Sequence, residues 1–149
     1  MPKAQRWTDP HCPVARAVDL VGDRWSLLIV RDAFDGARRF SEFERSLGIA
    51  KNILADRLRT LVEQGILDAR SNEHGTRQEY SLTDRGRDLF LVIVSLRQWG
   101  ETHAFTENEQ RSTLVDDTAG DSVPLLRLVN KQGVELTSAN THVRKVGDG

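Results

Sequence analysis

The chain has 149 residues and a formal net charge of −1, with 38% hydrophobic and 29% charged residues. This length and composition are typical of one globular domain, alone or with an appendage. No apolar run approaches the roughly 20 residues that span a bilayer, and the amino-terminal residues lack the apolar core of a secretory signal. We therefore expect a cytoplasmic protein that does not contact a membrane.

Net charge does not decide which class of partner the chain binds. Residues 36–85 hold nine Lys/Arg against eight acids, and residues 104–149 hold five against seven. Phosphate attraction supplies much of the affinity of a protein for nucleic acid. Only the local placement of basic side chains can therefore indicate such a site.

The amino-terminal part predicts two helices. Helical spacing of apolar residues begins after Pro13 and stops at Gly22. A second helix, from Asp23 as its N-cap to about Phe34, is apolar on nearly all sides. We expect this second helix to form the buried centre of the domain.

Residues 39–67 have the pattern of a helix-turn-helix. One short helix begins near Phe40, with Ser41 as its expected N-cap, and a second covers residues 50–64. The two meet at Gly48, where a glycine allows a sharp turn. In such a motif the second helix lies in the major groove of DNA.

The next segments predict a wing and a long helix. Residues 66–70 and 77–82 read as strands around a polar turn at 71–76, and a hairpin directly after a recognition helix is a wing. A helix over residues 84–103, capped by Thr83, carries more apolar surface than a small winged domain needs. Such excess indicates a second copy of the chain. The predicted dimer residues on the first and last helices are Val14, Val18, Leu89, Ile93, Leu96 and Trp99.

The remaining residues predict an appendage. Residues 104–121 are polar and acidic and read as a linker, and residues 122–149 read as an extension with a β-hairpin around 130–133. Because an isolated hairpin is marginal in water, it should dock on the main domain, residues 1–103, or on the partner subunit. The expected fold class is mainly α with a small β-wing, a winged helix-turn-helix that forms a homodimer through its N- and C-terminal helices.

Several linked motifs resemble one known family. After Cys12-Pro13 come GDRWSLLIVRD (22–32), RFSEFERSLGIAKNILADRLRTLVEQGIL (39–67) and YSLTDRGRDL (80–89). In this order they resemble the HxlR family of bacterial winged-helix regulators, relatives of the MarR group. The resemblance covers about residues 12–99 and implies a homodimer that binds double-stranded DNA at an operator and regulates neighbouring genes. Some relatives carry a cysteine-bearing, zinc-ribbon-like extension, whereas this chain has no cysteine beyond Cys12.

The second helix of the motif carries the predicted base contacts. Lys51, Asn52, Ala55 and Arg59 fall on one stripe opposite the apolar positions. Arg can bind guanine, Asn can pair with adenine, and a small Ala permits close approach to a thymine methyl. The alternative is a solvated helix face, which the turn before it and the wing after it disfavour.

Two further groups could contact the DNA backbone. Arg38, Arg39 and Ser41 could hold a phosphate at a helix N-terminus, although Arg39 could instead pair with an acid such as Glu42 or Glu63. In the wing, His74 and Arg77 are either backbone contacts or ordinary polar residues of a hairpin.

The signal that such a regulator would answer is left open. Cys12 lies at the start of a helix, where the dipole favours a thiolate, and in some relatives a cysteine at this place senses oxidants or electrophiles. The alternative is an inert thiol at the dimer seam. A small molecule could bind beside Trp25 and Trp99, for which core packing is the simpler role.

The sequence therefore predicts a sequence-specific DNA-binding transcriptional regulator. The alternative is a winged-helix module for protein–protein contact that does not bind DNA. An enzyme is disfavoured, because the chain has no phosphate loop, nucleophile elbow or metal-spaced set of His and Cys. We accordingly expect no catalytic residue, metal or cofactor.

Overall fold

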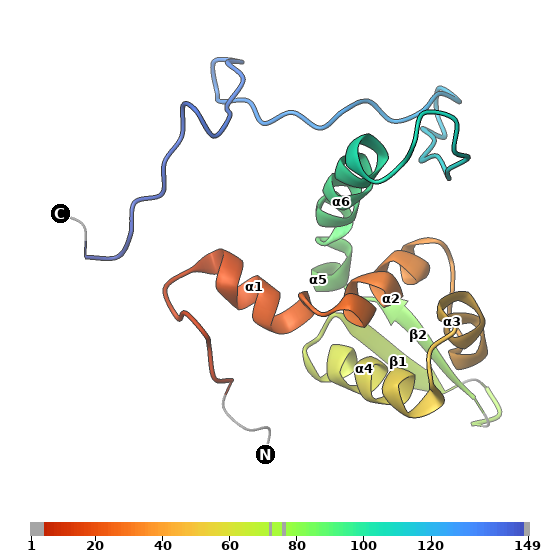
Figure 1. The fold of residues 1–149 in the computed structure, drawn as a ribbon. Coiled ribbons are helices and arrows are strands. Elements are labelled where there is room, and N and C mark those ends of the chain that lie inside the picture. Colours follow the sequence, from red (N-terminus) through yellow and green to blue (C-terminus); the bar gives the residue numbers. More distant parts are fainter. Residues whose placement is uncertain (1–4, 72, 76, 148–149) are drawn as a thin grey trace. The chain divides into compact units, whose positions relative to one another are not determined.

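The computed structural model describes residues 5–71, 73–75 and 77–147. Figure 1 shows its helices and strands, and the chain divides into two compact units, Met1–Ile93 and Val94–Gly149. None of the helices in the described ranges is long and apolar enough to cross a bilayer. In chain order the elements are α1 (Pro13–Val21), α2 (Arg24–Phe34), α3 (Phe40–Leu47), α4 (Lys51–Glu63), β1 (Leu67–Ser71), β2 (Gln78–Leu82), α5 (Asp84–Arg87) and α6 (Phe90–His103).

Helix α2 is the centre of the first unit, as predicted. Its N-cap is Asp23, whose Oδ2 accepts hydrogen bonds from the backbone N–H of Trp25 at 3.2 Å and of Ser26 at 3.0 Å. The helix packs against α3, α4 and β2. Together these elements enclose the core, which consists of Val21, Ile29, Val30, Ala33, Phe43, Ile49, Leu54, Leu58, Leu61, Ile66 and Leu67.

Helices α3 and α4 form the predicted helix-turn-helix. Gly48 ends α3 in the left-handed region at φ 60°, a conformation that a residue with a side chain rarely adopts. The expectation that Ser41 caps α3 is wrong, because the helix begins at Phe40 and Arg39 is its N-cap. Strand pairing is the reason: Arg39 forms a bridge with Glu79, which holds it in an extended conformation directly before the helix.

The wing is a two-stranded antiparallel sheet. Strand β1 pairs with β2 from Leu67 opposite Leu82 to Ser71 opposite Gln78. Both strands lie within one residue of the predicted ranges. The arrangement confirms the expected mainly α fold with a small wing.

The expectation of a single long helix over residues 84–103 is wrong in one respect, because the structure has two helices there, α5 and α6. At the break the N–H of Leu89 bonds to the carbonyl of Gly86 at 3.1 Å, three residues back. Gly86 lies so close to the backbone of Ile66 that a Cβ there would be 2.2 Å from its carbonyl oxygen. This close packing fixes α5 against the hairpin, while α6 starts a new helix.

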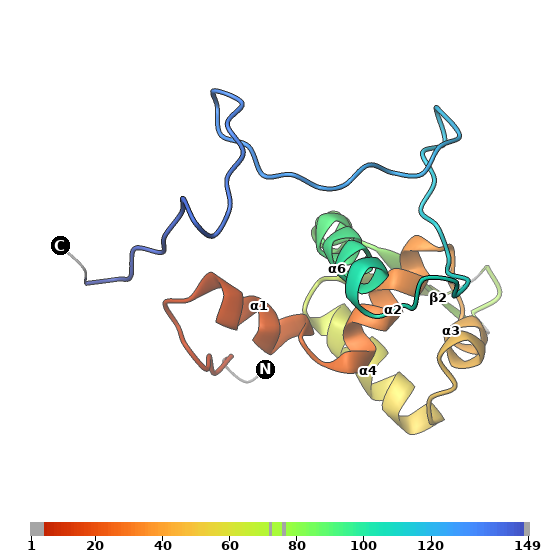
Figure 2. The same cartoon turned by 45° about the horizontal axis from the view of Figure 1, so that its top comes forward.

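Beyond α6 the second unit is an extended chain with turns (Figure 2). In its described residues the expected hairpin is reduced to one isolated bridge, Val129 opposite Glu135, around a turn. The side chain of Asn130 closes that turn by accepting hydrogen bonds from the N–H groups of Gln132 and Val134, both at 2.9 Å. A hairpin without a packed face has little to extend its ladder, which accounts for the single bridge.

Candidate nucleic-acid interface

One face of α4 is buried and the opposite face is uncovered. Leu54, Leu58 and Leu61 are fully enclosed in the core. The four residues predicted to contact bases, Lys51, Asn52, Ala55 and Arg59, are all exposed. The stripe is therefore accessible to a ligand as large as a nucleic acid.

Basic residues from three elements meet in a hollow beside the start of α4. The hollow has a volume of about 540 Å³ and lies between the start of α3, the start of α4 and β2. Of the predicted residues it brings together Arg39, Ser41, Lys51 and Arg77, and the acidic residue Glu44 also lines it. Guanidinium, ammonium and hydroxyl groups gathered in this way can donate hydrogen bonds to anionic oxygens such as those of a phosphate.

A second hollow continues along α4. It has a volume of about 390 Å³ and is lined by Ala55 and Arg59 of the stripe, together with Val62 and Ala69. Phe40, Gln78 and Tyr80 line both hollows, so the two share one wall. Helix α4 and the wing thus border one continuous surface.

Tyr80 and Gln78 are site residues that the sequence reasoning missed. The ring of Tyr80 meets Phe43 edge-on with centroids 6.3 Å apart, and its hydroxyl donates to Oε1 of Gln78 at 3.1 Å. Burial raises the pKa of Tyr80 above its ordinary 10.0, and the phenol is a hydrogen-bond donor at neutral pH with or without that rise. Alternation along β2 could have found Gln78, because residues two apart share one face of a strand.

Ion pairs orient the basic residues of α4. Asp56 pairs with Arg59 and with Nη1 of Arg57 at 3.1 Å, and Arg59 also lies 3.8 Å from Glu63. Arg57 reaches further, with its Nε 3.1 Å from Oδ2 of Asp23. This pair ties the recognition helix to the N-terminus of α2.

The environment of Asp23 keeps its carboxylate charged. Burial by itself works to raise the pKa of Asp23, but hydrogen bonds from Ser26, the charge of Arg57 and the N–H of Trp25 outweigh it, and the pKa is lowered. The carboxylate is therefore both the cap of α2 and an anchor for α4.

The residues before α3 divide between two roles. Arg39 pairs with Glu79 at 3.8 Å, rather than with Glu42 or Glu63. Arg38 lies apart from the two hollows, and its Nη1 donates to the carbonyls of Ala33 at 3.1 Å and Ala37 at 3.0 Å. Its predicted phosphate contact stays a prediction.

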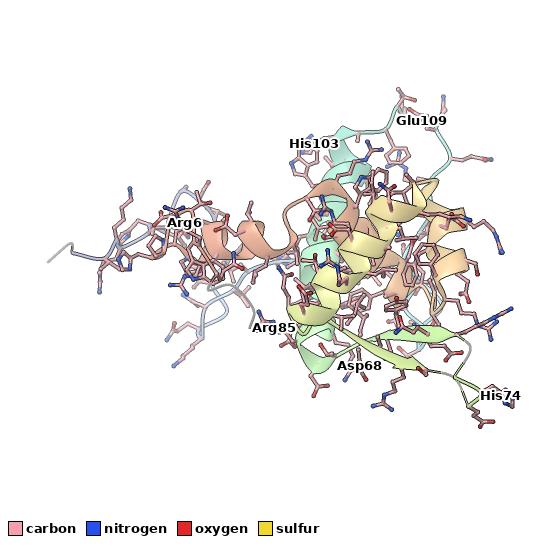
Figure 3. All side chains as sticks on the ribbon, turned by 90° about the horizontal axis from the view of Figure 1, so that it is seen from below. Arg6, Asp68, His74, Arg85, His103 and Glu109 are labelled. Atoms are coloured by element: carbon pink, nitrogen blue, oxygen red, sulfur yellow. The ribbon has the colours of Figure 1, made fainter. Side chains whose placement is uncertain are left out.

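The wing carries the two remaining residues that were predicted to contact DNA. Figure 3 shows His74 at the tip of the hairpin and Asp68 on its first strand. Both His74 and Arg77 are exposed, and Arg77 lines the first hollow. Asn72 and Thr76, both in the expected turn, lie outside the described residues.

The predicted sensor residue lies at a helix start. Cys12 is the N-cap of α1, it is partly exposed, and its Sγ accepts a hydrogen bond from the N–H of Ala15 at 3.4 Å. Trp25 packs against the core, whereas Trp99 is largely exposed. Within the described ranges no group of three or more His, Cys, Asp or Glu could hold a metal ion.

The predicted dimer residues fall into two groups. Val14 and Val18 of α1 and Leu96 and Trp99 of α6 are exposed. Leu89 and Ile93 instead pack against the core of their own unit.

The fold and this surface define a winged helix-turn-helix protein. The HxlR-like helix-turn-helix family model matches residues 20–108, more than half of the chain. The protein therefore belongs to the HxlR-like helix-turn-helix family.

Similar proteins are named as regulators of transcription. The helix-turn-helix-type transcriptional regulator Rv3095 of Mycobacterium tuberculosis is 42% identical over 128 residues, which cover 85% of this chain and 81% of Rv3095. The crystal structure of PA1607, described as a candidate transcription factor, is 51% identical with a TM-score of 0.87 and covers 91% of this chain and 96% of that one. The reduced form of the redox regulator HypR is 32% identical with a TM-score of 0.59, and covers 62% and 94% of the two chains. The family is one of transcriptional regulators and not of enzymes.

Proposed function

We propose that this transcriptional regulator binds double-stranded DNA as a homodimer, with α4 in the major groove and the wing against the flanking backbone. The observation that carries the proposal is the uncovered stripe of Lys51, Asn52, Ala55 and Arg59, rigidly held by the buried leucines on the other side of the same helix. A rigid helix with donors on its exposed face can form direct contacts with base edges.

The first hollow supports a role for backbone contacts. Arg39, Lys51 and Arg77 present three cations from different elements on one concave surface. Phosphate contacts fix the register of a protein on DNA, and base contacts give the specificity. In this proposal the hollow positions the duplex and the exposed residues of α4 read it.

The exposed apolar residues of the terminal helices support the homodimer. Val14 is 71% exposed and Val18 is 57% exposed on α1, and Trp99 is 65% exposed on α6. Burying such residues against a second copy would place two recognition helices on one face of the duplex.

A mobility-shift assay at two salt concentrations tests DNA binding. Selected operator DNA should bind in the nanomolar range and lose affinity steeply as salt rises, because each phosphate contact releases counterions. Replacing both Lys51 and Arg59 with Ala should lower the affinity by about 100-fold, and Arg85→Ala, which alters an exposed arginine of α5 outside the stripe, is the matched control. Absence of salt-sensitive DNA binding would refute the proposal in favour of a protein–protein module, and full affinity of the double variant would refute the placement of α4 in the groove.

The structural likeness to HypR supports a response to oxidants or electrophiles. Such a response would use Cys12, since it is the chain's only cysteine. An electrophilic quinone would form a sulfur–carbon bond to the thiolate of Cys12 at the start of α1. Cys12→Ser should then abolish any effect of a quinone on DNA binding, and an unchanged response would exclude Cys12 as the sensor.

A further inference from the structure

The second unit lacks an apolar core of its own. Among the described residues of Val94–Gly149, Val94 alone is buried, with 3% of its surface exposed. Large apolar side chains elsewhere in the unit are uncovered, and they include Trp99, Leu125, Leu128, Val134, Val143 and Val146. Apolar surface left open on this scale marks an interaction site.

The backbone of this unit is nevertheless held in a defined path. The side chain of Gln98 on α6 donates to the carbonyl of Pro124 at 3.0 Å and accepts from the N–H of Leu126 at 2.8 Å. Arg97 donates to the carbonyl of Ser112 at 3.1 Å. These bonds fix the root of the segment 122–147 on the helix.

Turns shape the segment further along the chain. Asn140 accepts a hydrogen bond from the N–H of Thr137 at 2.7 Å and donates to the carbonyl of Glu135 at 3.1 Å. The turn at Asn130 is closed in the same manner, by side chain to backbone bonds. A segment with preset turns and exposed apolar side chains loses less entropy when it docks than a free tail does.

The charges of the unit identify the partner that it fits. Residues 94–121 hold two bases against six acids, whereas residues 122–149 hold four bases against two acids. The unit as a whole is acidic, which disfavours nucleic acid as its partner. In a dimer with two-fold symmetry, the basic half of one copy can lie against the acidic half of the other, and the reverse pair forms at the same time. An isologous contact requires this kind of self-complementary surface.

We propose that two copies of the chain pack through this unit, with residues 122–147 of one copy lying against residues 94–121 of the other, and reciprocally. This inference rests on the homodimer proposed above and adds a second part to its interface. The occupant of the exposed apolar surface is thus the same unit of a second copy of the chain. The extension beyond the winged domain is then a dimerisation device rather than a linker to another partner.

Photo-crosslinking in the full chain tests the arrangement. Benzoylphenylalanine replaces Leu128 or Val143 in one batch, a second batch without it is labelled with ¹⁵N, and the two exchange subunits before irradiation without DNA. The proposal expects cross-linked peptides of mixed isotope whose other end lies within residues 94–121. Benzoylphenylalanine at Ile53, an exposed apolar residue of α4, is the control and should give no cross-links between copies.

A charge exchange tests the self-complementarity. Lys131→Glu with Arg144→Glu should weaken self-association about fivefold at low salt, and Glu107→Lys with Asp117→Lys should do the same, because like charges then face each other. A mixture of the two double variants should recover the affinity of the wild-type dimer. Failure of the mixture to recover would overturn the proposed pairing.

The outcomes separate this inference from the proposed function. A chain that stays monomeric at all concentrations refutes the homodimer and this interface together. If the chain is a dimer but positions 128 and 143 give no cross-linked peptides of mixed isotope, no link joins the two copies there. That result refutes this interface and leaves the contact through α1 and α6 standing. Because none of these measurements contains DNA, a failure of operator binding does not affect them.

Discussion

The two units of this chain differ in how far their large apolar side chains are buried. In Met1–Ile93, side chains such as Ile29, Phe43 and Leu58 are completely withdrawn from solvent. In Val94–Gly149, Leu125 is 72% exposed and Val143 is 83% exposed. The difference teaches that the first unit holds a hydrophobic core of its own, whereas the described residues of the second leave their apolar side chains open to a partner surface, as the proposed contact between two copies requires.

The two units also differ in what fixes the path of the backbone, which is packing in the first and local hydrogen bonds in the second. In the first unit, α5 is placed by close packing of Gly86 on the backbone of Ile66. In the second, turns are closed by the side chains of Asn130 and Asn140 on nearby backbone. Local hydrogen bonds can shape a loop without supplying the free energy that a packed core supplies.

Replacing one leucine with alanine in each unit should give the largest difference in stability between the two units. Leu58→Ala removes a fully buried side chain beneath the recognition helix, and should lower the free energy of unfolding by about 3 kcal/mol. Leu128→Ala, which alters an exposed residue, should change it by less than about 0.5 kcal/mol in dilute protein. Urea denaturation followed by circular dichroism measures both. Equal losses in the two variants would show that the second unit has a core within its own chain.

Matched glycine substitutions give the next contrast. Gly86→Ala should cost about 2 kcal/mol, because the new Cβ would lie 2.2 Å from the carbonyl oxygen of Ile66 and the backbone must shift. Gly100→Ala meets nothing within 4 Å inside α6 and should stabilise the helix by roughly 0.5 kcal/mol. Thermal unfolding of the two variants tests the pair. A tolerated Gly86→Ala would mean that α5 does not depend on this close approach.

The cap of α2 gives the smallest contrast, and its effect depends on pH. Asp23→Ala removes the acceptor for Trp25 and Ser26 and should cost about 1 kcal/mol at neutral pH. Because the pKa of Asp23 is lowered in the fold from its ordinary 3.8, the stabilisation is fully present above about pH 4 and is lost as the pH falls through the lower folded value. Urea midpoints of wild type and variant from pH 7 to pH 2 should therefore converge in acid.

Asp23→Asn is the matched control for that measurement, since Asn also caps helices but carries no charge. It should retain most of the stability at neutral pH and show less dependence on pH than the wild type. A gap between wild type and Asp23→Ala that widens in acid would contradict the assigned role of the carboxylate.

Much of the fold could be predicted from local patterns. The cap at Asp23, the left-handed turn at Gly48 and the alternation in the wing are each decided by residues within a few positions of one another. The stripe on α4 could be predicted for the same reason, because helical spacing alone puts Lys51 and Arg59 opposite the buried leucines.

Other features depend on residues far apart in the sequence. The cap of α3 was misassigned because Arg39 pairs with a strand that follows some 40 residues later, and the break in the long helix was missed because Gly86 meets Ile66. The link from Arg57 to Asp23, and the gathering of Arg39, Lys51 and Arg77 in one hollow, also join separate elements. The spacing of residues within one helix or strand carries no information on contacts between separate elements.

The sequence by itself determined the helices, the wing and the exposed face of α4, since hydrophobic periodicity and capping act over one or two turns of chain. Only the tertiary structure decided which residue caps α3, why α6 is separate from α5, and which cations share a hollow. It also showed that Leu89 and Ile93 pack on their own core while Leu128 and Val143 do not. Which apolar side chains find a partner depends on the packing of distant elements, and therefore on the whole fold.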